Sequence, residues 1–88
     1  MTDRSSQIEV RNPMLTLPAM LQLQQLPPDS QAAIEAILRD LSHDAAARAE
    51  KAWRQRKGPM AVYWKAAAVY ALHTARAIAR SRRRGRHA

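Results

Sequence analysis

Apolar residues recur at spacings of three and four along two long stretches of this chain, which is the period of an amphipathic helix. The first stretch runs from Ile34 to Trp53 and the second from Met60 to Ile78. They are separated by Gly58-Pro59, and a glycine-proline pair interrupts a helix. The pattern therefore predicts two helices, at about residues 30–57 and 60–82.

A shorter apolar segment precedes these helices. Thr16-Leu17-Pro18 has the composition of a helix start, with a capping side chain followed by proline in the first turn. Pro27-Pro28 then ends the segment, which predicts a short helix at residues 17–26. Residues 1–15 have no period and are predicted to form a flexible N-terminal arm, and residues 83–88 a basic tail.

The predicted fold is all-α, with a short N-terminal helix followed by a long antiparallel helical hairpin in one small domain. If the hairpin turns at Gly58-Pro59, residues whose numbers add up to about 116 face each other across it. The predicted pairs are Asp40 with Arg76, His43 with His73, Glu50 with Lys65 or Ala66, and Trp53 with Tyr63 and Trp64.

The third helix carries a second apolar line that one hairpin partner cannot cover. It consists of Val62, Ala66, Val69 and Leu72. Two explanations remain open. The short N-terminal helix packs on this line, or the line is the interface for a second copy of the chain or for another protein. A chain of 88 residues buries little surface by itself, so a homodimer or a protein partner is plausible.

Charge is distributed unevenly along the chain. The net charge is +8. Residues 1–47 hold three basic and six acidic side chains, whereas residues 48–88 hold twelve basic side chains and one acidic side chain, Glu50. A one-sided positive potential favours polyanions such as DNA or RNA.

The basic residues form two clusters that are candidate nucleic-acid contacts. The first surrounds the predicted turn and is interleaved with aromatic residues; it contains Lys51, Arg54, Arg56, Lys57 and Lys65. The second lies at the C-terminal end and contains Arg76, Arg80, Arg82, Arg83, Arg84 and Arg86. The planar guanidinium of arginine suits both phosphates and guanine edges. A solvated basic face without a partner is the alternative.

A helix-turn-helix motif is a further alternative for the middle of the chain. A break at Ser42-His43-Asp44 would leave a second helix with basic side chains on one face, as a recognition helix requires. No glycine or proline lies at that position, which argues against a break there.

The sequence offers no catalytic apparatus. Cysteine is absent, the serines lie in no nucleophile motif, and two glycines cannot form a phosphate-binding loop. His43 and His73 lack the third and fourth ligands of a metal site. We therefore predict no enzyme activity, no metal, no cofactor and no small-molecule substrate. The longest apolar run, Ala66–Leu72, is too short to cross a bilayer, and the N-terminus lacks a signal core, which predicts a soluble cytoplasmic protein.

Two functions are compatible with these features. The first is a small nucleic-acid-binding protein, a regulator or accessory factor, that contacts mainly phosphates. The second is an inhibitor or adaptor that docks on a protein through the apolar line of the third helix. In size and composition, the segment Lys51–Arg80 is similar to accessory proteins of mobile genetic elements, and this similarity assigns no residue a role.

Overall fold

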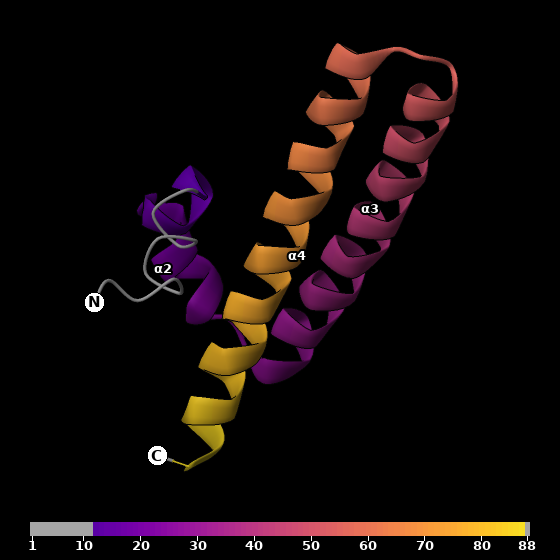
Figure 1. The fold of residues 1–88 in the computed structure, drawn as a ribbon. Coiled ribbons are helices and arrows are strands. Elements are labelled where there is room, and N and C mark those ends of the chain that lie inside the picture. Colours follow the sequence, from indigo (N-terminus) through magenta and orange to yellow (C-terminus); the bar gives the residue numbers. More distant parts are fainter. Residues whose placement is uncertain (1–11, 88) are drawn as a thin grey trace, which may run out of the picture.

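A computed structural model describes residues 12–87, which are entirely helical apart from short connections (Figure 1). A 3₁₀ helix, η1 (Pro13–Thr16), is followed by a short α-helix, α2 (Ala19–Gln24). Two long helices, α3 (Pro28–Arg54) and α4 (Gly58–His87), then pack against each other as a hairpin. The predicted all-α fold, a short N-terminal helix before a helical hairpin, is confirmed.

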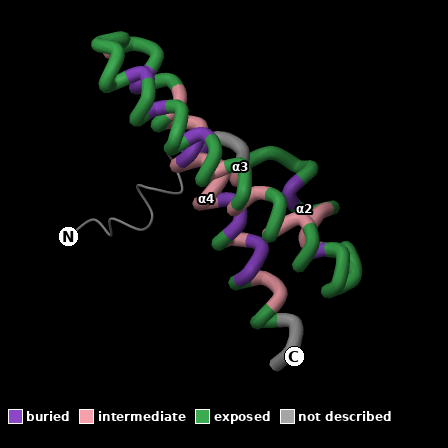
Figure 2. Tube along the Cα trace, turned by 90° about the vertical axis from the view of Figure 1, so that its right-hand side faces the viewer, coloured by how far each residue is buried: buried purple, intermediate pink, exposed green. Residues whose placement is uncertain are grey.

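Small side chains fill the interface between the two long helices. The buried residues there are Ala45, Ala49 and Ala52 from α3, and Ala61, Ala68, Ala75, Ile78 and Ala79 from α4. In Figure 2 they form the inner line of the hairpin, and most of the turn end is exposed. Because alanine has no side chain beyond Cβ, it lets two helices of about 40 Å approach closely.

The predicted apolar stretch of α3 supplies the buried Ala45, Ala49 and Ala52. In the first half of α4, however, the buried face differs from the predicted one by a rotation of about one residue. Met60, where the predicted period began, and Tyr63 are exposed. On α4, the neighbouring line that begins at Ala61 and includes Ala68 is buried instead. Alanines occur on both candidate lines, so the apolar period alone did not distinguish them.

The turn between the helices lies at Gln55–Lys57, before the glycine. The amide of Arg56 donates to the carbonyl of Trp53 at 3.0 Å, and the amide of Lys57 donates to the carbonyl of Ala52 at 2.8 Å. This pair of hydrogen bonds is a Schellman motif, whose C′ residue adopts a left-handed conformation. That residue is Arg56, with a φ of 59°, whereas Gly58 has no positive φ.

The predicted register differs from the structure in the middle of the hairpin. Ser42 donates to the carbonyl of Ala68 at 2.7 Å, where the predicted register placed residue 74. At the open end, Glu35 pairs with Arg82 at 2.7 Å, close to the predicted sum of 116. Asp40 and Arg76, predicted to pair, are both exposed and form no ion pair within residues 12–87.

The long helices also differ in extent from the sequence prediction. α3 runs without interruption through Ser42, so the helix-turn-helix interpretation is wrong. α4 continues to His87, beyond the predicted helix end at residue 82. Its last turns extend past the start of α3, so the C-terminal end lies far from the turn (Figure 1).

The N-terminal segment packs on the side of α4 away from α3 (Figure 1). The side chain of Asn12 is fully buried, and its Nδ2 donates to the carbonyl of Tyr70 at 3.2 Å and to Thr74 Oγ1 at 3.4 Å. The packed domain therefore includes residues that the sequence assigned to the arm of residues 1–15. The part of that arm before Asn12 lies outside the described residues.

Gln31 connects the short helix to the hairpin. Its side chain is buried, and Nε2 donates to the carbonyls of Gln24 and Leu26 at 2.8 and 2.7 Å. These carbonyls follow the last turn of α2 and have no partner within that helix. A buried amide on α3 thus fixes the orientation of α2.

An ion-pair triad closes the open end of the hairpin. Glu35 accepts from Arg39 at 3.0 Å and from Arg82 at 2.7 Å. Burial opposes ionisation of Glu35, but the two guanidinium groups outweigh it and hold the pKa of the carboxyl below its usual 4.5. Arg82 therefore has a structural partner.

The left-handed residue at the turn can be tested by substitution. We expect Arg56→Gly to unfold at a higher temperature than Arg56→Ala, by about 1 kcal/mol of stability, because glycine adopts positive φ without steric cost. Both variants lose the same charge, so the comparison isolates the backbone. At Gly58 the order should reverse: Gly58→Ala should stabilise the protein, because nothing lies within 4 Å of an added Cβ. Equal stability of the two Arg56 variants would contradict this.

The triad should make stability depend on pH below about 4.5. A carboxyl whose pKa is lowered by folding contributes stability that is complete above its unfolded-state pKa and lost as pH falls through its folded-state pKa. We expect Glu35→Gln to destabilise the protein at pH 7 by about 1–3 kcal/mol and to approach the wild type as pH falls. Chemical unfolding across pH measures this. Asp40→Asn, at an exposed position of the same helix, is the control and should change little.

Candidate nucleic-acid interface

Three basic side chains converge at the turn end of the hairpin. Lys51 and Lys57, both predicted from the sequence, line a small pocket of about 170 Å³ together with Arg48. The indole of Trp64 and the side chain of Met60 complete its wall. No carboxylate lines the pocket, so it presents a concave positive surface to solvent.

Arg48 is the residue of this pocket that was absent from the predicted clusters. Its guanidinium carbon lies 5.2 Å from the centroid of the Trp64 ring, within cation–π distance. Its Nε lies 3.9 Å from a carboxylate oxygen of Asp44, one turn earlier on α3. The sequence could have indicated that Arg48 belongs with Lys51, since the two are three residues apart and share one face of a helix.

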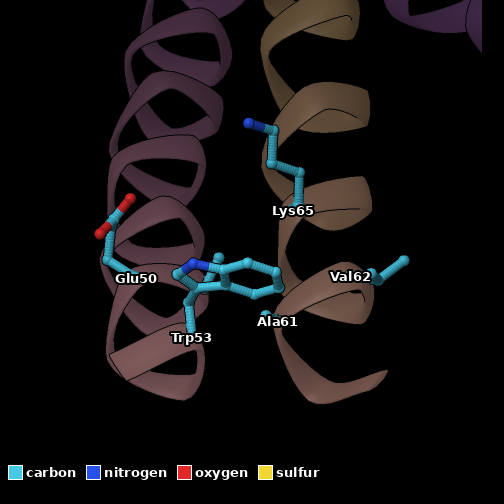
Figure 3. Close-up of a pocket in the computed structure, with 6 residues that line it drawn as sticks. Glu50, Trp53, Ala61, Val62 and Lys65 are labelled. Atoms are coloured by element: carbon cyan, nitrogen blue, oxygen red, sulfur yellow. The ribbon is translucent and has the colours of Figure 1, made fainter. Parts of the chain in front are cut away.

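A second pocket lies on the other side of the alanine interface. It has a volume of about 350 Å³ and is lined by Ala49, Glu50, Trp53, Ala61, Val62 and Lys65. In Figure 3 the indole of Trp53 extends from α3 toward α4, and Lys65 stands one turn further along α4. Glu50 and Lys65 line the same pocket, as the predicted register suggested. Neither Tyr63 nor Trp64, the predicted aromatic partners of Trp53, lines this pocket.

The hairpin therefore separates the two tryptophans instead of gathering them. Trp53 lines one pocket and Trp64 the other. Trp64 contacts Tyr63 edge to face, with ring centroids 5.3 Å apart. The predicted turn cluster is divided in the same way, with Lys65 beside Trp53 and the pair Lys51 and Lys57 beside Trp64. The remaining members, Arg54 and Arg56, are exposed at the turn and line neither pocket.

The C-terminal cluster forms an exposed stripe along α4. Arg76, Arg80, Arg83 and Arg84 are exposed and recur at spacings that place them on one side of a helix. Arg82 is set apart from them by its ion pair with Glu35. The side chain of Arg86 lies outside the described part of the structure.

The predicted partner interface on α4 is only partly accessible. Val62 is 67% exposed, whereas Ala66, Val69 and Leu72 are half-buried. The N-terminal segment packs against α4, so part of the second apolar line is covered by the chain itself. What remains exposed is the end near the turn, beside Trp53.

The two central histidines differ in exposure. His43 is exposed on α3, whereas His73 is half-buried on α4 with a buried Nδ1 that has no hydrogen-bond partner within residues 12–87. Within the same residues, no three metal-ligating side chains gather, and no helix is long and apolar enough to span a bilayer.

Comparison of the chain with protein-family models, with curated proteins and with solved structures finds no match.

Proposed function

We propose that this protein binds nucleic acid, mainly through backbone phosphates, as a small cytoplasmic regulator or accessory factor without enzymatic activity. The observation that supports this most directly is the convergence of Arg48, Lys51 and Lys57 in one pocket without a carboxylate in its lining. Phosphate oxygens are the groups that such donors bind best, because each contact is a charge-assisted hydrogen bond.

The pocket is partly preorganised for an anion. Trp64 stacks against the guanidinium of Arg48, and Asp44 contacts the same group from one turn earlier. A side chain held in this way loses less conformational entropy on binding than a free one. Lys51 and Lys57 are exposed and supply mobile charges at the edge of the site.

The arginine stripe on α4 supports a second contact with the same polyanion. From Gly58 to Arg83, the helix rises about 38 Å, which is close to one turn of B-form DNA at roughly 34–36 Å. The turn end and the stripe can therefore contact phosphates about one turn apart on one duplex. Contacts of this kind give affinity with little sequence readout.

Docking on another protein is the alternative function, and the exposure of Val62 favours it. The other three residues of the predicted interface are half-buried, which leaves a smaller apolar surface than the sequence indicated. Self-association through the same exposed end is a variant of this alternative. Light scattering distinguishes it, because a dimer through this end should dissociate when Val62 is changed to Asp.

The phosphate pocket can be tested by neutralising its lysines. We expect Lys51→Gln with Lys57→Gln to weaken binding of unrelated duplexes to a similar extent. The slope of log affinity against log salt should decrease by about one unit per lost phosphate contact. The matched control is Arg4→Gln with Arg11→Gln, which removes the same charge far away in the sequence. Equal effects of the two double variants would mean that only net charge matters, and would contradict a site.

The arginine stripe requires point substitutions and not truncation. Removing the end of α4 would also remove Arg82 and leave Glu35 with one partner fewer, so a truncated chain could lose binding through lost stability. Arg83→Gln with Arg84→Gln changes only exposed side chains. We expect it to reduce the salt slope by up to about two units on all sequences, with an unchanged melting temperature. Unchanged affinity and slope at low and moderate salt would show that the stripe is only solvated.

A further inference from the structure

Trp53 is a large aromatic residue that the hairpin leaves mostly outside its interface. It lies in the last turn of α3, and 66% of it is exposed. The neighbouring interface is filled by the small side chains of Ala49, Ala52 and Ala61, which are buried. Exposing most of an indole forgoes the stabilisation that its burial would give. An exposed tryptophan beside a pocket is thus a feature that the stability of the hairpin does not require.

The surroundings of this indole combine a flat apolar surface with charge. The pocket of about 350 Å³ has Trp53, Ala61 and Val62 as apolar lining and Glu50 and Lys65 as polar lining. In Figure 3 the ring lies across the space between α3 and α4, with Lys65 extending beyond it. Arg54 and Lys57, also exposed, follow Trp53 closely in the chain. The ring is therefore accessible within a positively charged region.

We propose that this pocket holds one unpaired base of single-stranded nucleic acid, stacked on Trp53, with Lys65 contacting an adjacent phosphate. This inference rests on the proposed function and adds a contact with a single-stranded segment to the phosphate contacts of the turn end. Every base has a π-face, so stacking is compatible with any sequence. In a duplex both faces of each base are covered by its neighbours, so only an unpaired base can stack on an indole.

The charges of the pocket favour a base over an apolar side chain of a protein partner. Lys and Glu are depleted at the centres of protein interfaces, because burying them is costly. In a pocket for a base they have direct uses. Lys65 can neutralise a phosphate, and the carboxylate of Glu50 can accept a hydrogen bond from an N–H group of the base.

Trp64 provides an internal control in the same protein. It is half-buried, and Arg48 already occupies a position over its ring. Stacking of a base on Trp64 would have to displace that guanidinium. The two tryptophans lie on opposite sides of the alanine interface, so substitution at one leaves the other pocket intact.

The test compares two single-stranded probes that differ only in their bases. One is a short oligothymidylate and the other is an abasic oligonucleotide of the same length, which carries the same phosphates. We expect Trp53→Ala to weaken oligothymidylate binding about tenfold to hundredfold and abasic binding less than about twofold. Trp53→Phe should restore most of the affinity. Tryptophan fluorescence should be quenched by oligothymidylate in Trp64→Phe, where Trp53 is the remaining tryptophan, and much less in Trp53→Phe.

The outcomes separate this inference from the proposed function. Equal losses on both probes, or unchanged oligothymidylate binding by a folded Trp53→Ala variant, would overturn the stacking site. The proposed function would still stand if duplex binding by the wild type were lost in Lys51→Gln with Lys57→Gln. If the wild type binds no nucleic acid even at low salt, both proposals fail. A thermal melt confirms that Trp53→Ala folds, which its exposure leads us to expect.

Discussion

The close contact between α3 and α4 through alanine is the constraint on which the rest of this structure depends. Ala45, Ala49 and Ala68 bury little apolar area each, so the interface itself contributes modest stability. The hairpin compensates by fixing its ends. A Schellman motif closes one end, and the Glu35–Arg82 ion pair closes the other. Asn12 and the N-terminal segment add a third layer on the far side of α4.

The same constraint determines where the aromatic residues lie. Helices that approach at alanine distance have no room for an indole between them, so Trp53 and Trp64 are displaced to opposite sides of the interface. Each then lines a pocket among basic residues that the helix ends supply. The candidate binding surface is thus a consequence of the packing. The narrow interface excludes the two indoles, which therefore lie beside the basic side chains near the turn.

The sequence predicted the helices and their hairpin because helical periodicity and proline positions are local signals. It did not predict the exact position of the turn, because the left-handed residue is Arg56 and not the glycine two residues later. The positions of the basic residues in the sequence identified the two clusters, but they could not show which members share a pocket or an ion pair. Only tertiary packing assigns Arg82 to Glu35, Lys65 to Trp53, and Arg48 to Trp64. Asn12 was missed because its partners, Tyr70 and Thr74, are distant in the chain.

The turn itself illustrates how stability and charge compete in a small basic protein. A left-handed arginine costs about 1–2 kcal/mol relative to glycine, which is a substantial part of the stability of a domain of this size. Gly58, two residues later, has no positive φ. The left-handed position is therefore occupied by arginine although a glycine lies nearby. What Arg56 adds is an exposed guanidinium at the tip of the hairpin. A strained residue that adds positive charge at the turn is consistent with binding of a polyanion there. It also places a further cation at the end of the hairpin that carries both tryptophans.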